Sequence, residues 1–142
     1  MSYYETFIRE IVKMSQANTW AEAKFEWEVQ DIAFVKNSSC LCGKYPIREV
    51  INMHNHQTNN LTQVGNCCVK KFFDDSEWSK VFSAIKRGKV NEKLIMHAYQ
   101  KKVINDWERD FMLDVWRKQI MSGKQREKYK NINQKIIERF SK

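Results

Sequence analysis

The sequence predicts a mostly α-helical protein with a small β-hairpin insert. The chain of 142 residues contains only 4 glycines and 1 proline, too few for a turn-rich all-β fold. Apolar residues recur at helical spacing over most of the chain. The exception is the segment around residues 40–66, where short apolar runs alternate with turn residues, as in paired strands. We therefore expect helices before and after one hairpin.

Residues 1–39 are expected to form N-terminal helices. A first helix over residues 2–16 places a set of apolar side chains on one face: Tyr4, Phe7, Ile8, Ile11 and Val12. A second helix begins near Trp20, where Thr19 and Glu22 have the spacing of a capping box. The apolar spacing then continues through Ile32 to Val35, which predicts further helix.

Residues 40–73 are expected to form a hairpin followed by a helix. The run IREVINM (47–53) predicts one strand and LTQVG (61–65) a second, with a turn composition between them. Helix is expected again from NCCVKKFF (66–73). This order brings the two ends of the segment close together.

Residues 74–142 are expected to form a C-terminal helical region. Asp74, Asp75 or Ser76 caps a helix whose inward face carries Trp78, Val81, Phe82 and Ile85 and which stops at Gly88. Further caps are predicted at Asn91, at Asn105 with Glu108, and at Ser122 with Gln125. The apolar positions of the last helix are Tyr129, Ile132, Ile136 and Phe140. We expect all three regions to pack as one compact domain.

All 4 cysteines lie between residues 40 and 68, in the pairs Cys40–Cys42 and Cys67–Cys68. A tight knuckle and a helix start joined by a hairpin are the usual parts of a zinc site, so we predict that Zn²⁺ binds these four residues. Gly43 suits the knuckle, and Gly65 is expected to meet the same need for a positive φ angle. Redox pairing and plain buried cysteines are the alternatives. Because both pairs depart from C-x-x-C spacing, the fourth ligand is left open between Cys67, His54 and His56.

A site with four protein ligands leaves no position for a reactive water, so the predicted zinc stabilises the hairpin and does not catalyse a reaction. The sequence contains no H-E-x-x-H, no phosphate-binding glycine loop and no G-x-S-x-G. We therefore expect that the protein is not an enzyme.

The run CLCGKYPIREVINMHNHQTNNLTQVGNCCVKKFF resembles a small zinc-binding module of phages, large DNA viruses, bacteria and fungi, most of whose members are uncharacterised. The matching positions are Cys40, Cys42, Gly43, Pro46, Ile47, Asn55, Val64, Gly65, Asn66, Cys68 and Phe72. In some members the position of Ile51 is a cysteine; this chain lacks it, and Cys67 is a candidate to take its place. The resemblance implies a zinc finger of treble-clef-like or zinc-ribbon-like form, a viral or phage origin and, less directly, DNA binding.

The chain carries 25 Lys and Arg against 17 Asp and Glu, for a net charge of +8. Between residues 117 and 142 there are 9 basic and 2 acidic side chains, so the last helix is the most basic element. An excess of this kind favours a nucleic-acid partner. The expected phosphate contacts are Lys70, Lys71, Lys86, Arg87, Lys89, Lys124, Arg126, Lys128, Lys130 and Lys135. The turn at Ser122 is expected to form a helix-turn-helix-like corner.

The sequence thus favours a zinc-stabilised nucleic-acid-binding accessory protein. The alternative is a protein–protein adaptor that docks on a host or viral machine, for which the five tryptophans offer anchor residues. No run of apolar residues is long enough to span a membrane, so we expect no membrane partner. The run MSYYETFIREI carries charges inside its apolar pattern, unlike a signal peptide, so we expect an intracellular location in the cytoplasm or nucleus of a host cell. In such a reducing compartment, closely spaced cysteines are more often metal ligands than a disulfide.

Overall fold

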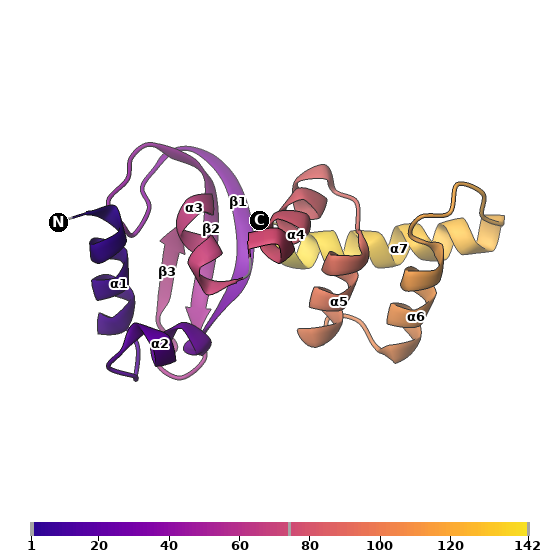
Figure 1. Ribbon diagram of the computed structural model, residues 1–142. Helices are drawn as coiled ribbons and strands as arrows, with labels where there is room; N and C mark the ends of the chain where they lie inside the picture. The colour runs from indigo at the N-terminus through magenta and orange to yellow at the C-terminus, as the bar shows by residue number, and fades with distance from the viewer. Residues whose placement is uncertain (1, 74, 142) are drawn as a thin grey trace. The chain divides into compact units, whose positions relative to one another are not determined.

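The computed structural model describes residues 2–73 and 75–141 (Figure 1). Its contacts divide these residues into two compact units: unit 1, residues 2–73, and unit 2, residues 75–141. Each unit is described by itself below, and the expectation of one compact domain stays a prediction. Among the described residues, seven α-helices and one three-stranded antiparallel sheet confirm a mostly helical fold with a small β insert.

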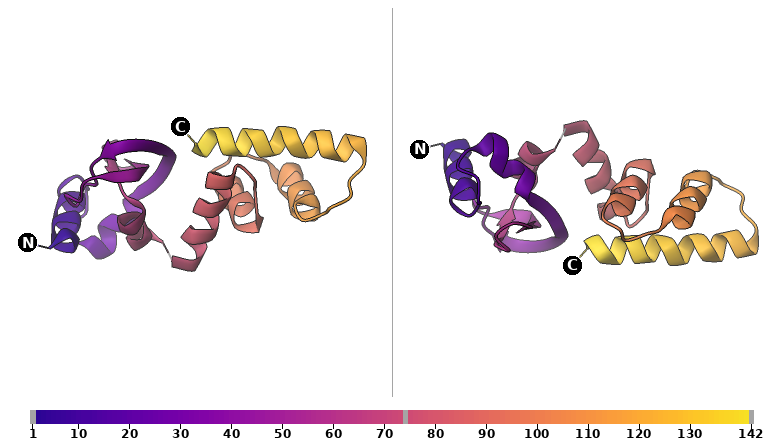
Figure 2. Two further views of the ribbon diagram at one scale, coloured as in Figure 1. Left: turned by 90° about the horizontal axis from the view of Figure 1, so that it is seen from above. Right: turned by 90° about the horizontal axis from the view of Figure 1, so that it is seen from below.

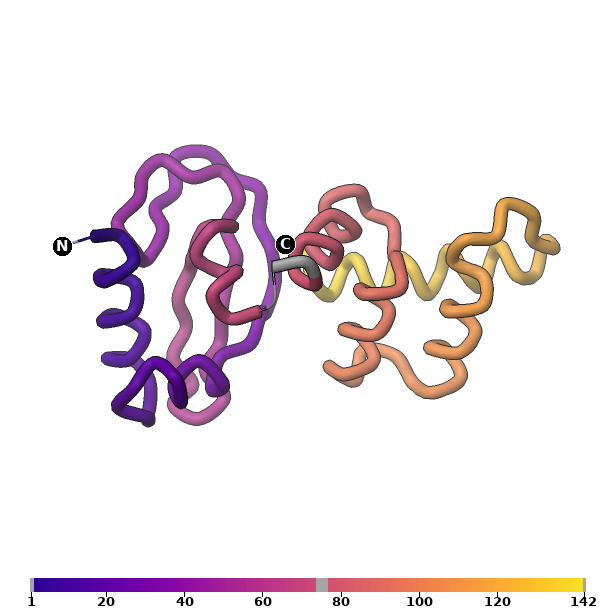
Figure 3. The backbone as a smooth tube through the Cα atoms, viewed as in Figure 1, coloured from indigo at the N-terminus to yellow at the C-terminus, as the bar shows by residue number. Residues whose placement is uncertain are grey.

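Unit 1 combines the sheet with short helices. Its elements are α1 (Tyr3–Lys13), α2 (Trp20–Ala23), β1 (Trp27–Ser38), β2 (Ile47–Asn55), β3 (Leu61–Val64) and α3 (Asn66–Val69), with 3₁₀ turns at Lys24–Glu26 and Lys70–Phe72. The strands lie in the order β1-β2-β3, so β2 is central. Figure 3 follows the chain from the long β1 through β2 and β3 into α3, which lies against the last two strands.

The long strand β1 occupies residues that the sequence assigned to helix, so the prediction of helix over residues 27–35 is wrong. The first inward side chains, Trp27 and Val29, have the alternation of a strand. The pairing with β2 then shifts between Val29 and Asp31, and the next buried side chain is Ile32. An irregularity of this kind moves the inward face by one residue and imitates helical spacing.

Three aromatic rings join α1 to the rest of unit 1. Phe7 lies 5.5 Å from Trp20 and 5.6 Å from Phe72, and Trp20 lies 5.2 Å from Phe72, measured between ring centroids. All three pairs meet edge to face, an arrangement that aromatic quadrupoles favour. The cluster therefore packs α1 and α2 against the 3₁₀ turn Lys70–Phe72 that follows α3.

The turn between β2 and β3 is organised by Asn55, which is fully buried. Its side-chain oxygen accepts hydrogen bonds from the backbone N–H groups of Gln57 and Thr58, at 2.7 and 2.9 Å. Its amide donates to the carboxylate of Glu26 at 3.1 Å. The buried Glu26 also accepts from the backbone N–H groups of Gln16 and Ala17, both at 2.8 Å. One carboxylate therefore ties together the turn after α1 and the end of β2.

Unit 2 is entirely helical among its described residues. It contains α4 (Asp75–Arg87), α5 (Glu92–Gln100), α6 (Asp106–Val115) and α7 (Gly123–Phe140). Figures 1 and 2 show the long α7 running past α5 and α6. The predicted apolar faces are buried: Trp78, Val81, Phe82 and Ile85 on α4, and Tyr129, Ile132, Ile136 and Phe140 on α7. Asn133 on α7 holds the loop between α4 and α5 by accepting from Val90 N–H at 2.9 Å and donating to the Gly88 carbonyl at 3.0 Å.

The predicted helix ends are partly correct. Capping boxes form at Asn105 with Glu108 and at Ser122 with Gln125, and Asn91 caps α5. Gly88, with φ of +72°, follows the last residue of α4 as expected. The Thr19 side chain makes no capping hydrogen bond, so the first predicted box is wrong. The cap expected at Asp74, Asp75 or Ser76 lies outside the residues whose side chains the structure describes.

The helix before Ser122 is shorter than predicted, and the compact corner expected there is absent. Helix α6 ends at Val115, and residues 116–122 link it to α7. Beyond Val115, the side chains of residues 117–120 are exposed and offer no apolar face to pack. Because short helices depend on such packing, the helix does not continue. A link of this length does not match the short turn of a helix-turn-helix.

Candidate metal centre

A tight turn between β1 and β2 places the first two cysteines. The backbone N–H of Gly43 donates to the Cys40 carbonyl at 2.9 Å, and the N–H of Cys40 donates to the Lys44 carbonyl at 3.0 Å. Gly43 has φ of +99°, a conformation that side chains other than glycine rarely adopt. The predicted role of Gly43 in the knuckle is therefore confirmed. The N–H of Leu41 bonds the Gln63 carbonyl at 3.1 Å, which fixes the turn to β3.

The third cysteine comes from the helix that follows β3. Cys68 lies in α3, whose first turn closes through the hydrogen bond from Val69 N–H to the Gly65 carbonyl at 3.1 Å. The Sγ atoms of Cys40, Cys42 and Cys68 all lie within 4.8 Å of one another. All three residues are buried, with no more than 5 % of the surface of any of them exposed. The fold thus gathers thiols from two segments of the chain into one protected cluster.

The arrangement fits a metal ion bound by sulfur. A tetrahedral zinc ion with Zn–S bonds of about 2.3 Å has ligand sulfurs roughly 3.8 Å apart, within the upper bound that the three thiols satisfy. The cysteines are free rather than disulfide-bonded. Soft thiolates favour zinc, copper(I) and iron–sulfur groups over magnesium or calcium. The three cysteines can therefore hold a metal ion.

Without a metal the thiols share protons unequally. A hydrogen bond from the Cys68 thiol lowers the pKa of Cys40 to about 5, against the opposing effect of burial. The N–H groups of Cys42 and Gly65 also favour the Cys40 thiolate, and Gly65 N–H lies 3.2 Å from its sulfur. The same hydrogen bond to Cys40, together with burial, raises the pKa of Cys68. The cluster thus stabilises one thiolate even before a cation is bound.

None of the three candidates for a fourth ligand joins this cluster. Cys67 is exposed, and it is absent from the group of thiols that lie within reach of one another. His54 lies 3.4 Å from the Glu28 carboxylate and 3.3 Å from the Asn59 side chain. His56 lies 3.0 Å from the Phe25 carbonyl oxygen. The structure therefore brings together three of the four predicted ligands, Cys40, Cys42 and Cys68, and Cys67 lies outside this group.

Gly65 has a different role from the one predicted. Its φ of −81° is open to any residue, so the expected positive φ is wrong. A side chain at this position would meet the Ile47 side chain at 3.6 Å and the Cβ of Cys40 at 3.9 Å. These are ordinary contact distances, and the specific contribution of Gly65 is its N–H donated to Cys40.

A cavity of about 400 Å³ opens beside the cysteines. Three basic side chains line it: Lys44, Arg48 and Lys71. The Nζ of Lys71 lies 3.9 Å from the Cys68 sulfur and over the ring of Phe7, 5.2 Å from its centroid. These cations offset the negative charge of a thiolate cluster. Sequence reasoning did not single out Lys44, although it lies two residues from Cys42, and it missed Arg48 because the fold brings that side chain to the cysteines.

The predicted phosphate-binding residues belong to both units. Lys70 and Lys71 lie in unit 1, and Lys71 is placed at the thiol cluster rather than on an open surface. The other eight lie in unit 2 and are exposed: Lys86, Arg87, Lys89, Lys124, Arg126, Lys128, Lys130 and Lys135. Unit 2 carries 16 basic and 9 acidic residues over positions 75–141, for a net charge of +7. Nearly all of the positive excess of the chain therefore belongs to unit 2.

The five predicted phosphate contacts on α7 do not share one face. At 100° per residue, Lys124, Lys128 and Lys135 fall on one flank of the buried stripe, and Arg126 and Lys130 fall on the other. Lys135 bonds the Glu108 carboxylate of α6 at 3.2 Å. For Lys124, Arg126, Lys128 and Lys130, no carboxylate partner is present among the described residues. Two separate basic flanks are thus available on this helix.

None of the described helices combines the length and the apolar character needed to cross a membrane. Comparison of the chain with protein-family models, with curated proteins and with solved structures finds no match.

Proposed function

We propose that this protein is a zinc-stabilised nucleic-acid-binding accessory protein, in which unit 1 is held by the metal and unit 2 contacts phosphates. One observation carries the second half of the proposal. The net charge of unit 2 is +7, and four cations of α7 have no carboxylate partner among the described residues. Unpaired cations on an exposed helix are available to replace the counterions of a phosphate backbone.

The three buried thiols support zinc as the metal. In the proposed form, the knuckle at Cys40–Gly43, the β2–β3 hairpin and Cys68 on α3 make a treble-clef-like finger. A zinc ribbon draws its ligands from two knuckles, whereas here the second ligand segment is helical, which favours the treble-clef-like form. The metal links β1, β2 and α3, and we assign it a structural role without catalysis.

The setting of the protein is part of the same proposal. Thiolate ligands need a reducing environment, which fits the cytoplasm or nucleus of a host cell. A viral or phage origin rests on the resemblance of residues 40–73 to the small zinc module described above. The C-x-C-G spacing and the V-G-N-x-C run are the features that support this resemblance.

A titration with labelled nucleic acid tests the phosphate contacts. The purified chain is mixed with short single-stranded and duplex DNA and RNA at two salt concentrations, and fluorescence anisotropy reports binding. Affinity is expected to fall by a constant power of the salt concentration, with a slope of about 0.7–0.9 per phosphate contacted. Absence of binding at low salt, or binding that salt does not weaken, contradicts the proposal.

A protein–protein adaptor is the second candidate. It is favoured by exposed large apolar side chains on unit 1, namely Tyr3, Tyr4, Phe25, Tyr45 and Leu61, each more than half exposed. Of the five tryptophans only Trp107 is exposed, so the predicted tryptophan anchors support it less. Recovery of one stoichiometric protein partner after nuclease treatment, with no affinity for nucleic acid, would favour this candidate.

A further inference from the structure

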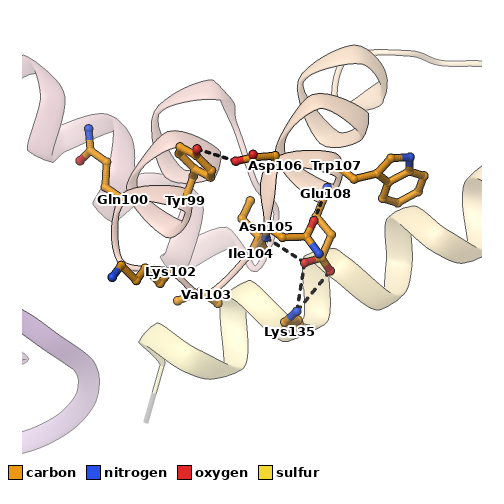
Figure 4. Close-up of a pocket in the computed structure, with 10 residues that line it drawn as sticks. All are labelled: Tyr99, Gln100, Lys102, Val103, Ile104, Asn105, Asp106, Trp107, Glu108 and Lys135. Atoms are coloured by element: carbon orange, nitrogen blue, oxygen red, sulfur yellow. Dashed lines mark hydrogen bonds and ion pairs between the residues drawn. The ribbon is translucent and has the colours of Figure 1, made fainter.

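The first turn of α6 carries an exposed tryptophan beside the basic helix. The Trp107 side chain is 57 % exposed, while Trp27 and Trp78 are buried. Figure 4 shows its indole pointing away from Tyr99 and Asp106. A single exposed aromatic residue is ordinary on a protein surface. Trp107 differs from an ordinary exposed aromatic residue in two ways: its ring stacks on Phe111, and lysines of α7 lie beside it.

The indole is held in place by its own helix and by α7. Its ring stacks on that of Phe111, one turn later, with a centroid separation of 5.3 Å and an interplanar angle of 8°. Glu108 closes the capping box of α6 and binds Lys135 of α7 at 3.2 Å (Figure 4). The platform is therefore pre-organised, which lowers the entropy lost when a ligand stacks on it.

The charges around the ring favour an anion. The Lys128 Nζ lies 5.1 Å from the centroid of the Trp107 ring, and Lys124 precedes it by one helical turn on the same flank of α7. Neither lysine has a carboxylate partner among the described residues.

The carboxylates near Trp107 are each engaged. Asp106 accepts from the Tyr99 hydroxyl at 2.6 Å, Glu108 binds Lys135, and Asp110 binds Arg109 at 3.0 Å. Glu108 and Asp110 are thus paired with cations, and the charge that Asp106 keeps is outnumbered by Lys124 and Lys128, so the balance around the indole is positive.

We propose that Trp107, Lys124 and Lys128 form a binding site for single-stranded nucleic acid. A base stacks on the indole in place of the Lys128 ammonium, and the two lysines contact the adjoining phosphates. A duplex keeps its base faces stacked inside and offers only phosphates, whereas a single strand offers both groups. This inference rests on the proposed function and names its ligand class.

The test compares a labelled oligothymidylate with a duplex of equal length by fluorescence anisotropy. Trp107→Leu keeps apolar contact with Phe111 but removes the aromatic face. It is expected to weaken single-strand binding by roughly 5- to 150-fold, the equivalent of one base–aromatic stack, and to leave duplex binding unchanged. Trp107→Phe restores a stacking face and is expected to recover most of the affinity. Because the residue is exposed, all variants are expected to retain the thermal unfolding midpoint of the parent chain.

A pair of matched charge variants locates the phosphates. Lys124→Gln with Lys128→Gln removes two charges from the flank beside Trp107, and Arg126→Gln with Lys130→Gln removes two from the opposite flank. The first pair is expected to lower the slope of log affinity against log salt by about 1.4 for single strands, and the second to change it far less.

The failures of the two proposals are distinguishable. If the parent chain binds neither ligand, both are overturned. Two results would overturn only this inference in a chain that still binds nucleic acid. One is that Trp107→Leu binds single strands as tightly as the parent chain does. The other is that both charge variants lower the slope of log affinity against log salt by the same amount.

Discussion

Cys67 and Cys68 are neighbours in the chain and have opposite environments. Cys68 is buried with the sulfurs of Cys40 and Cys42, whereas Cys67 is exposed. Adjacent residues in a helix point about 100° apart, so only one of them can face the knuckle. Sequence reasoning can pair the two cysteine segments, but it cannot choose between adjacent residues without the orientation of the helix.

This difference leads to a prediction for metal affinity. Cys40→Ser, Cys42→Ser and Cys68→Ser each remove a soft ligand and are expected to weaken zinc binding by about 100-fold or more. Cys67→Ser, at an exposed position, is expected to bind zinc nearly as the parent chain does. Competition with a chromophoric zinc chelator measures all four. Equal losses in Cys67→Ser and Cys68→Ser would show that Cys67 is the fourth ligand.

Tyr129 on α7 carries a buried hydroxyl that the sequence pattern did not reveal as unsatisfied. Its side chain is buried, and its hydroxyl has no hydrogen-bond partner among the described residues. Burial also raises the pKa of this phenol. The sequence shows correctly that Tyr129 belongs to the apolar stripe, but a periodic pattern does not reveal an unsatisfied hydroxyl.

Removal of that hydroxyl is expected to stabilise unit 2. A buried polar group without a partner costs about 1–3 kcal/mol, so Tyr129→Phe is expected to raise the free energy of unfolding by about 1 kcal/mol. Chemical denaturation followed by circular dichroism measures it. Tyr99→Phe serves as the control, since it removes a hydroxyl that donates to Asp106 and is expected to give no gain. A clear loss of stability in Tyr129→Phe would contradict the description of this site.

Among the elements, the hairpin was predictable and β1 was not. The run from Ile47 to Met53 is rich in β-branched residues and is followed by polar turn residues, and β2 and β3 form where expected. In β1 the irregularity after Val29 destroys the alternation from which a strand is recognised. Pairing with β2 along its length then decides the conformation, and pairing between distant segments is not visible in a local pattern.

The start of β1 depends on Glu26, whose carboxylate bonds two backbone N–H groups and Asn55. Burial alone would raise the pKa of Glu26, but the hydrogen bonds from Gln16, Asn55 and Ala17 together hold it below the ordinary value of 4.5. Because the folded-state pKa is the lower one, the contribution of Glu26 to stability is present above pH 4.5. It is lost as the pH falls through the folded-state pKa.

A comparison of variants across pH tests this carboxylate. Glu26→Gln replaces one acceptor oxygen with a donor and is expected to destabilise unit 1 by about 1 kcal/mol or more at about pH 7. The difference from the parent chain is expected to shrink as the pH falls below 4.5. Acid also releases metal from thiolates, so the parent and variant are compared at each pH.

Glu22→Gln, at an exposed position, is the control for Glu26→Gln and is expected to have no effect. A stability difference between Glu26→Gln and the parent chain that stays constant at all pH values would contradict the assignment.

At the scale of the whole molecule, the chain divides its properties between two units. Unit 1 holds every cysteine and carries 8 basic and 7 acidic residues over positions 1–73, whereas unit 2 carries the positive charge. The charge division was readable from the sequence, because it needs only the positions of the residues. The division into two packed units was not, since it depends on which apolar faces meet.

This division predicts separate responses to metal removal. Addition of a zinc chelator to the intact chain is expected to expose the backbone of unit 1, because the metal would link the knuckle at Cys40 and Cys42 to Cys68 on α3. Unit 2 contains no cysteine, and its helices are expected to remain folded. Hydrogen–deuterium exchange resolved by segment is expected to show faster exchange in residues 27–69 and little change in residues 94–136, with recovery when zinc is restored. Loss of protection in both units together would contradict independent stability.

The central claim is that three buried thiols bind a zinc ion that stabilises unit 1. Native mass spectrometry of the intact chain, purified under reducing conditions, tests it most directly, because it counts bound metal and also detects copurified nucleic acid. We expect one zinc ion per chain, retained in Cys67→Ser and lost in Cys68→Ser. A metal-free chain whose mass shows a disulfide would contradict the account.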